Sequence, residues 1–365
     1  MVASDLQSTQ DLRAVPPLTK SELRDLGPEP FLTRRLWRSE RSQTAGTSGQ
    51  PVTVIRDSRE RGRLLARRWA CQSWHGLKPG DREARFWGRS ESATKNLFLA
   101  MAANRRVFTF LDGADNDPAR EAVALAKFKP DFLYGYSSLL LRAAEFLCNS
   151  EDRPHPKVVI CTAESIQESQ RRFISQVFAC PVILEYGCSE FDIVAYTCPS
   201  GRMHVLSPEI LLEVDAGEVL VTDLDNHLMP LLRFRLGDMV RLESSPCDCG
   251  WRTPIIGEIQ GRTIGQILIL PSGRETHAVV FAHAFEASTL DGISIRRFQV
   301  LQESPRDLRI VLEGDADLDD NAVNERIRAA ILDRLPEYMQ ITIERGVIPT
   351  IPGRKFTYFV PLSGD

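Results

Sequence analysis

Along residues 58–190, stretches with apolar residues at helical spacing alternate with short runs of apolar residues. Apolar side chains recur at helical spacing over three stretches, residues 58–74, 117–127 and 137–149. Short apolar runs at 131–134, 157–161 and 181–186 indicate strands, and a further helix is predicted over residues 165–179. Strands and helices in alternation predict a parallel sheet wrapped by helices. Ligands are then expected outside the carboxyl ends of its strands.

The pattern changes to short strands after residue 203 and again at Gly261-Arg262. Residues 209–214 and 218–223 flank Asp215–Gly217, an arrangement that is typical of a hairpin. Before the alternating region, a short helix is predicted at Lys20–Leu26. Beyond residue 262 we expect a strand over 266–270, a turn at Pro271–Gly273, strands paired around Pro305–Asp307, a helix over 319–334 and a final strand pair ending at 361.

These patterns together predict the fold class. A large N-terminal α/β domain, residues 1–260, combines parallel sheets and helices with a β-rich subdomain. A small α+β C-terminal domain, residues 261–365, follows it and has the size of a small independent unit.

Composition narrows the class of protein. The chain has 365 residues, of which 43% are hydrophobic and 26% charged, as in ordinary soluble proteins. A formal net charge of −4 argues against a nucleic-acid partner bound by bulk electrostatics. Neither a membrane-spanning run nor a signal-peptide pattern is visible, so no membrane association is expected. Eight cysteines suit reduced thiols or metal ligands in the cytoplasm better than a disulfide scaffold.

Residues 44–51 form a Gly/Ser/Thr-rich turn that closes on Pro51. Its glycines allow close approach of the backbone to a ligand, and clustered N–H groups favour anions such as phosphate. The residues with this chemistry are Thr44, Gly46, Thr47, Ser48 and Gly49. An ordinary polar surface loop is the alternative interpretation of this segment alone.

Three later segments carry further candidate chemistry. Tyr186–Glu190 follows an apolar run, where a carboxylate can hold Mg²⁺ and an aromatic ring can stack on a base. Arg235–Asp238 places an Asp after a Gly turn, where it can accept hydrogen bonds from two ribose hydroxyls. Lys355 lies in a turn between two predicted strands. Exposed turn residues and a solvated lysine are the alternatives in each case.

In order and spacing, these four segments resemble the signature motifs of adenylate-forming enzymes. The resemblance is strongest toward the phenylacetate–coenzyme A ligase branch and its relatives in capsule and natural-product pathways. Ala163-Glu164, Gly261-Arg262 and Pro349–Lys355 extend it, so that it covers residues 20–362.

The resemblance implies a ligase that acts in two steps. A carboxylate attacks the α-phosphate of ATP to give an acyl-adenylate and pyrophosphate, and then coenzyme A or an amine displaces AMP. The implied partners are a small carboxylic acid and one of those acceptors, and a homodimer is compatible with the resemblance.

The resemblance also implies roles for individual residues. Thr44–Gly49 would hold the pyrophosphate end of ATP, and Lys355 and Glu190 would be catalytic, with Glu190 binding magnesium. The remaining implied nucleotide contacts are Ala163, Glu164, Tyr186, Gly187, Ser189, Asp238 and Arg262. A lysine between the carboxylate and the α-phosphate would offset developing negative charge.

Two positions depart from the pattern of these enzymes. An acidic hinge residue commonly follows the Gly-Arg pair, whereas here the sequence is Gly261-Arg-Thr-Ile-Gly265, which leaves the rotation of the small domain open. Cys188 stands where an aliphatic residue is common, and we interpret it as a packing residue because no activating His is near it.

A separate group of residues predicts a structural zinc site. Cys198 and His204 flank a turn with five residues between them, and Cys247 and Cys249 follow the next strands. Three thiolates and one imidazole complete a tetrahedral zinc set within a β segment at about 196–250. Relatives in this branch carry a similar zinc knuckle. Buried free cysteines are the alternative.

Several assignments stay open at this stage. Cys71, Cys148, Cys161 and Cys180 fall on apolar faces and are expected in the core. Aromatic residues before the adenine motifs belong either to an acyl pocket or to the core, namely Trp87, Phe108, Phe110, Phe132, Tyr134 and Tyr136.

Two other functions compete with the ligase. One is an adenylyltransferase that leaves AMP on a hydroxyl, and the other is a non-catalytic scaffold.

Overall fold

The computed structural model describes most of the chain and divides it into two units. The described residues are 11–34, 40–43, 52–87, 104–110, 117–243, 245–262, 267–278, 280–281, 284–285, 295–314, 321–335, 337–348 and 357–362. One unit joins Met1–Pro79 to Ile183–Arg262, and the other joins Gly80–Val182 to Thr263–Asp365. The boundary between the units after Arg262 coincides with the change of pattern that the sequence shows at Gly261-Arg262.

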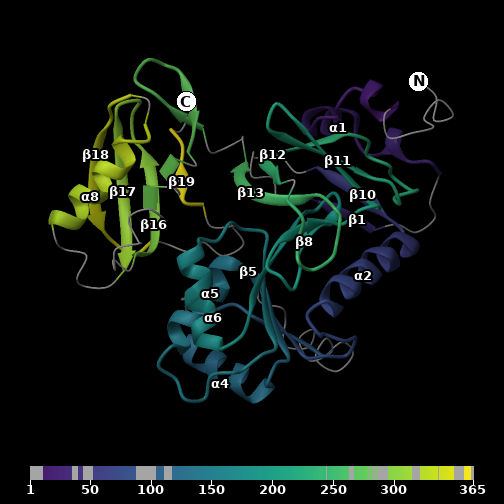
Figure 1. Cartoon of the computed structure of the whole chain (residues 1–365), viewed down its shortest axis with the longest axis horizontal. Helices are drawn as coiled ribbons and strands as arrows, with labels where there is room; N and C mark the ends of the chain where they lie inside the picture. Colours follow the sequence, from purple (N-terminus) through teal and green to yellow (C-terminus); the bar gives the residue numbers. More distant parts are fainter. Residues whose placement is uncertain are drawn as a thin grey trace. The chain divides into compact units, whose positions relative to one another are not determined.

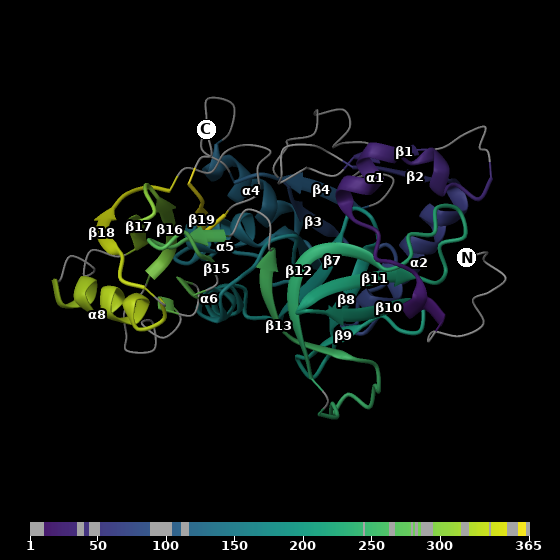
Figure 2. The same ribbon diagram turned by 90° about the horizontal axis from the view of Figure 1, so that it is seen from above.

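The first unit is built on antiparallel strands in the order β10-β11-β12-β13-β9-β8-β7 (Figure 2). Their bounds are β7 Val182–Cys188, β8 Asp192–Thr197, β9 Met203–Val205, β10 Ile210–Asp215, β11 Glu218–Asp223, β12 Phe234–Glu243 and β13 Ile255–Arg262. The hairpin predicted around Asp215–Gly217 is confirmed, since β10 and β11 pair antiparallel up to Asp215 and Glu218.

Helix α2 (Ser58–Ser73) packs against β8 of the same unit. It begins where the sequence predicts, because the carboxylate of Asp57 accepts a hydrogen bond of 2.7 Å from the Glu60 backbone N–H. On its inner face, Arg63 and Arg67 both bond to the buried carboxylate of Asp223. Because that carboxylate is only 2% exposed, the pair of guanidinium groups supplies the charge compensation that burial requires.

A short N-terminal segment is attached to β12. It contains two 3₁₀ turns, η2 (Asp11–Ala14) and η3 (Glu29–Phe31), and the predicted helix α1 (Lys20–Leu26). Thr19 caps α1 through a capping box with Glu22. Leu18 pairs with Phe234 in a parallel bridge, so the first residues of β12 are bonded to this segment.

Strands β1 (Glu40–Gln43) and β2 (Thr53–Arg56) form an antiparallel hairpin. Their register pairs Gln43 with Thr53. The described residues that flank the Gly/Ser/Thr-rich segment 44–51 are therefore adjacent, whereas the segment itself lies outside the described residues.

The second unit contains parallel strands in the order β6-β5-β3-β4, as the alternating pattern predicts. The strands are β3 Glu83–Phe86, β4 Arg105–Phe108, β5 Phe132–Tyr136 and β6 Val158–Thr162, and the helices are α4 Pro118–Phe128, α5 Ser137–Leu147 and α6 Glu168–Phe178. Figure 1 shows α5 and α6 side by side, and α5 packs on β5 and β6. Gly135 permits this strand spacing, because a Cβ there would lie 2.1 Å from the backbone oxygen of Phe86.

Residues 263–365 of this unit form an α+β part with its own apolar core. Its sheet has the order β18-β17-β16-β19, covered by α8 (Asn321–Leu332), and a hairpin of β14 and β15 precedes it. The strands are β14 Ile267–Ile269, β15 Glu275–His277, β16 Ile295–Gln302, β17 Asp307–Gly314, β18 Gln340–Arg345 and β19 Phe359–Val360.

One prediction for this part is wrong. The last two strands, β18 and β19, do not pair with each other as expected. Strand β18 pairs with β17 and β19 pairs with β16, both in parallel. Strands that follow each other in sequence are not always neighbours in a sheet, and β18 and β19 lie at opposite edges of this one.

Candidate functional site

The motif Tyr186–Glu190 lies at the end of β7 and in the short turn to β8, as the sequence predicts. Gly187 is required there by space, because a Cβ would lie 1.9 Å from the backbone oxygen of Asp192. Ser189 is exposed and its carbonyl accepts a hydrogen bond from Arg56. The close approach of the two strands therefore fixes where Glu190 emerges.

Asp238 lies inside β12 and not in a turn, which corrects the interpretation of Arg235–Asp238. Gly237 has φ +76° and interrupts the pairing with β11 as a bulge, and β12 then continues along β13. A bulge re-aims side chains without ending a strand. Gly237 therefore has the left-handed backbone conformation that is typical of a turn, but here it forms a bulge within a strand.

Tyr186 and Asp238 meet in the first unit, although 52 positions separate them. The Tyr186 hydroxyl donates a hydrogen bond of 2.8 Å to Oδ2 of Asp238, and both side chains are buried. Asp238 is also the register partner of Arg262 on β13, so these two residues occupy opposite positions of one strand pair. The side chain of Arg262 lies outside the described residues.

Glu190 is a buried carboxylate with few partners. It is 4% exposed, and among the described residues its Oε1 has no hydrogen-bond donor. The nearest charge is Nζ of Lys20, 3.7 Å from Oε1. A carboxylate oxygen that lacks a donor is the type of hard ligand that Mg²⁺ binds, so the residue fits the metal that the resemblance implies.

Arginines from β2 and α2 hold the turn that carries Glu190. Arg56 bonds to the carbonyl of Ser189 at 2.5 Å, and Arg67 lies 3.5 Å from the carbonyls of Phe191 and Ile193. Arg68 bonds to Asp192 at 2.7 Å. These bonds to charged donors are stronger than neutral ones, and sequence reasoning missed all three residues as supports of the site.

Ala163 and Glu164 follow β6 in the second unit, at the carboxyl end of a parallel strand as expected. Ala163 has φ +69°, a conformation that is strained for a residue with a Cβ. The Glu164 carboxylate accepts a hydrogen bond of 2.9 Å from the backbone N–H of Ser138, and its carbonyl accepts one from the hydroxyl of Ser137. Glu164 therefore caps the start of α5.

The aromatic residues of the second unit fall into two groups. Phe108, Phe110 and Phe132 are buried in the core. Trp87 follows β3 and stacks on Tyr136 with ring centroids 4.2 Å apart, and neither of the two is fully buried. Tyr134 stacks on Trp87 with ring centroids 6.3 Å apart and is itself buried, and a role of these aromatic residues in an acyl pocket stays a prediction.

Three predicted features lie outside the described residues. They are the loop with Thr44, Gly46, Thr47, Ser48 and Gly49, the catalytic Lys355, and the hinge residue Gly265. Their roles stay predictions.

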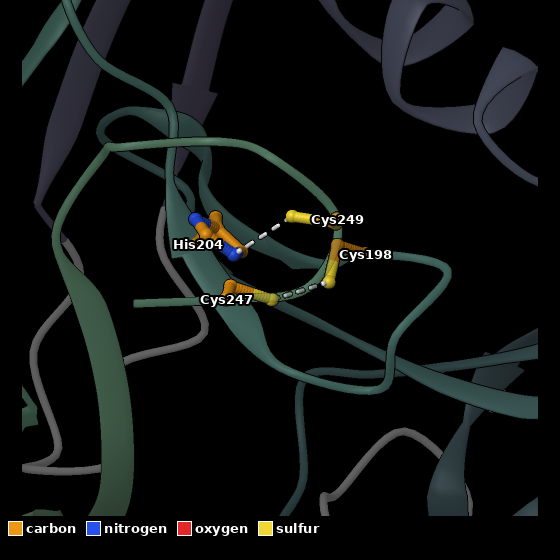
Figure 3. Close-up of side chains that lie close together, drawn as sticks. All are labelled: Cys198, His204, Cys247 and Cys249. Carbon is orange, nitrogen blue, oxygen red and sulfur yellow. Dashed lines mark hydrogen bonds between the residues drawn. The ribbon is translucent and has the colours of Figure 1, made fainter. Parts of the chain in front are cut away.

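The four predicted zinc ligands come together in the first unit (Figure 3). All four ligand atoms of Cys198, His204, Cys247 and Cys249 lie within 4.8 Å of one another. Cys198 and His204 are brought in by β8 and β9, while the two other cysteines lie on the turn between β12 and β13. The cluster therefore joins the two ends of the segment that contains Asp238.

The spacing of the ligand atoms fits a tetrahedral metal. The sulfur atoms of Cys198 and Cys247 lie 3.7 Å apart, and Cys249 Sγ lies 3.4 Å from Nε2 of His204. Tetrahedral Zn²⁺ with Zn–S bonds of about 2.3 Å and Zn–N bonds of about 2.0 Å separates such pairs by about 3.5–3.8 Å. These two distances and the donor chemistry are compatible with zinc, which stays a prediction.

A residue outside the cluster orients the imidazole of His204. His204 is fully buried, and its Nδ1 lies 2.9 Å from the hydroxyl of Thr253, which leaves Nε2 toward the cluster. Contact with His204 and the neighbouring thiols lowers the pKa of the Cys247 thiol, whereas desolvation raises the pKa of the Cys249 thiol, so one thiolate is favoured in the cluster without metal. Thr253 was not predicted, because nothing local in the sequence distinguishes it.

Burial disfavours the thiolate at four cysteines outside the cluster. All eight cysteines are free, and desolvation raises the pKa of Cys71, Cys161 and Cys180 to about 12. Desolvation likewise raises the pKa of Cys188 well above its ordinary value, which agrees with a packing residue and not a nucleophile. Cys148 is half-buried.

Comparison with known proteins adds sequence relatives. No protein-family model matches the chain. It is 22% identical over 246 residues to protein CapK of Staphylococcus aureus, covering 64% of this chain and 55% of that protein. It is 27% identical over 285 residues to phenylacetate-coenzyme A ligase of Thermus thermophilus (71% and 63% covered). Indoleacetate–lysine synthetase of Pseudomonas savastanoi is 29% identical over 174 residues (46% and 44% covered). The chain spans about half of CapK and of the synthetase, and 63% of the ligase.

Solved structures show the fold. A 2-hydroxyisobutyryl-CoA ligase in its postadenylation state matches 99% of this chain and 83% of its own, with TM-score 0.75 and 16% identity. An anthranilate CoA ligase bound to anthranoyl-AMP matches with TM-score 0.56 and 15% identity, over 86% of this chain and 64% of its own. The chain thus has the fold of the adenylate-forming ligases, with a large mixed α/β part and a smaller C-terminal part.

The sequence relatives confirm the resemblance to the phenylacetate–coenzyme A ligase-like branch. None of the helices in the described residues has the length and apolar character needed to cross a membrane.

Proposed function

We propose that this protein is an ATP-dependent ligase that activates a carboxylic acid as an acyl-adenylate. The observation that carries the proposal is the hydrogen-bonded pair of Tyr186 and Asp238, buried in the same unit as Glu190, whose Oε1 accepts no hydrogen bond from the described residues. Tyr186 lies on β7, Glu190 in the turn that follows it and Asp238 at the bulge of β12, which supports their predicted roles toward base, metal and ribose. An ordinary exposed turn would not bury them.

In the first step, a carboxylate oxygen of the acid attacks the α-phosphorus of ATP. The bond from that phosphorus to the bridging oxygen breaks, and pyrophosphate leaves with the electron pair. Asp238 holds the ribose hydroxyls, and Lys355 stabilises the negative charge that develops at the α-phosphate. Glu190 would hold magnesium, which supplies charge compensation at the phosphate oxygens when bound.

In the second step, a nucleophile attacks the acyl carbon and the mixed anhydride bond to AMP breaks. We propose coenzyme A or an amine as that nucleophile. The relatives support both, since one is named a coenzyme A ligase and another an indoleacetate–lysine synthetase. Residues 261–365 act in this proposal as a mobile domain that presents Lys355, with residues 1–260 binding ATP and acid.

The Cys198, His204, Cys247 and Cys249 cluster holds a structural Zn²⁺ in this proposal. Four protein ligands close the coordination sphere, so the ion would leave no position for substrate or water. Its geometry supports the assignment, and the ATP chemistry would still require magnesium.

Isotope exchange between pyrophosphate and ATP tests the proposed function. Purified full-length protein is incubated with ATP, Mg²⁺, labelled pyrophosphate and a panel of aliphatic and aromatic acids. Exchange that depends on one of the acids supports the ligase. Transfer of AMP to a hydroxyl acceptor without acid-dependent exchange would instead identify an adenylyltransferase.

Asp238→Ala should weaken ATP binding by about 1.5–3 kcal/mol, the range for hydrogen bonds to a charged group. That corresponds to about a 10- to 150-fold rise of the dissociation constant. Calorimetric titration with ATP measures it, and Asp225→Ala, a partly exposed Asp of the same unit, is the control. An unchanged constant in Asp238→Ala would mean that this residue does not contact ribose.

A further inference from the structure

The only described cation that reaches the Glu190 carboxylate comes from the N-terminal helix, far away in the sequence. Nζ of Lys20 lies 3.7 Å from Glu190 Oε1, with the lysine side chain 21% exposed and the glutamate side chain 2% exposed. We propose that Lys20 makes metal binding at Glu190 depend on the nucleotide. Its ammonium neutralises Glu190 in the free protein, opposes a bare divalent cation, and transfers to phosphate oxygens when ATP enters. The inference rests on the proposed function in taking ATP as the ligand.

Hydrogen bonds fix the backbone next to Lys20, so its side chain starts from a defined point. Leu18 N–H donates to the Arg233 carbonyl at 3.2 Å, and the Arg235 N–H donates to the Leu18 carbonyl at 2.9 Å. Thr19 then caps α1, whose first residue is Lys20. The segment is attached to β12, the strand of Asp238, and its lysine extends toward the turn of Glu190.

Electrostatics explains why this pairing matters. A buried carboxylate without a counter-charge is costly, and Oε1 of Glu190 has no hydrogen-bond donor in the described part of the chain. The ammonium of Lys20 therefore stabilises the ionised carboxylate before any metal binds. It remains a mobile point charge on a flexible stem, unlike the arginines that hold the turn.

The same charge has opposite effects on the two ligands. A bare Mg²⁺ or Mn²⁺ at Glu190 meets the positive ammonium nearby, and the repulsion is weakly screened because the carboxylate is buried. Free ATP brings negative phosphates, which the ammonium attracts as a point charge. Removal of Lys20 should therefore strengthen binding of the bare cation and weaken binding of metal-free ATP.

The experiment titrates the full-length protein with Mn²⁺ in the absence of nucleotide and follows free Mn²⁺ by electron paramagnetic resonance. Lys20→Met should bind Mn²⁺ at least about tenfold tighter than the wild type, and the gain should disappear in Lys20→Met combined with Glu190→Gln. Lys20→Arg should retain the wild-type constant. In a second titration with EDTA present, Lys20→Met should bind ATP at least about fivefold more weakly.

Two variants keep the test decisive. Lys157→Met removes a lysine that is also paired with a carboxylate, that of Asp81 at 2.9 Å, and should change neither constant. Lys20→Gln replaces Lys20→Met if the latter unfolds at lower temperature. An unchanged Mn²⁺ constant on loss of the ammonium would overturn the proposal, and so would an unchanged ATP constant. Neither titration involves an acid, so absence of acid-dependent pyrophosphate exchange would count against the ligase and not against Lys20.

Discussion

Lys355→Ala is expected to slow acyl-adenylate formation by about 100- to 1000-fold, the usual loss when one charge-stabilising donor is removed from a transition state. Lys355 is the implied cation between the attacking carboxylate and the α-phosphate. ATP binding should change little, because Asp238 and Tyr186 lie in a different part of the chain. Acid-dependent pyrophosphate exchange measures the rate, and calorimetric titration measures the ATP dissociation constant.

The adjacent Arg354 provides the control for this substitution. Arg354→Ala removes a neighbouring positive charge of the same segment, and it should leave the exchange rate within a few-fold of the wild type. Normal exchange in Lys355→Ala would remove Lys355 from the mechanism. Equal losses in both variants would point to the net charge of the segment and away from a specific contact.

Cys247→Ser should abolish zinc binding and lower the unfolding temperature by about 5–10 °C, as expected when a domain of this size loses several kcal/mol. Wild-type protein prepared without chelators should contain about one zinc per chain. Activity should fall as a secondary effect, because the cluster joins both ends of the segment that carries Asp238. Elemental analysis and differential scanning calorimetry measure the two primary effects.

Cys180→Ser is a matched control, since Cys180 and Cys247 are both 8% exposed but only Cys247 belongs to the cluster. It should retain zinc and unfold near the wild-type temperature. Wild-type protein without zinc would contradict the metal site and leave the four residues as a group of buried thiols and an imidazole.

The helices and several strands could be predicted because they depend on residues that are close together in the sequence. Helices α2 and α4 begin after Asp57 and Asp117, whose side chains bond to backbone N–H groups of the first turn, and apolar spacing fixes their extent. The ligands of the metal cluster were predicted for a different reason. Cysteine and histidine have few roles when several occur close to tight turns.

Features that depend on contacts between distant residues could not be predicted. Gly237 signals a left-handed residue, but only the pairing of β12 with both neighbours shows that it forms a bulge and not a turn. Lys20 and Thr253 have ordinary sequence surroundings, and their significance comes from Glu190 and His204, which they contact through the tertiary structure. The pairing of β18 with β17 and of β19 with β16 could not be predicted for the same reason.

The attachment of the N-terminal segment to β12 has a consequence for the nascent chain. Arg233 bonds to the carbonyl of Val15, 218 positions earlier, and Leu18 forms a parallel bridge with Phe234 at the start of β12. At about 5–20 residues per second, the ribosome needs about 10–45 s to synthesise that interval. Throughout this time residues 15–18 have no strand to join, so the native attachment that positions Lys20 near Glu190 forms only after β12 emerges from the ribosome.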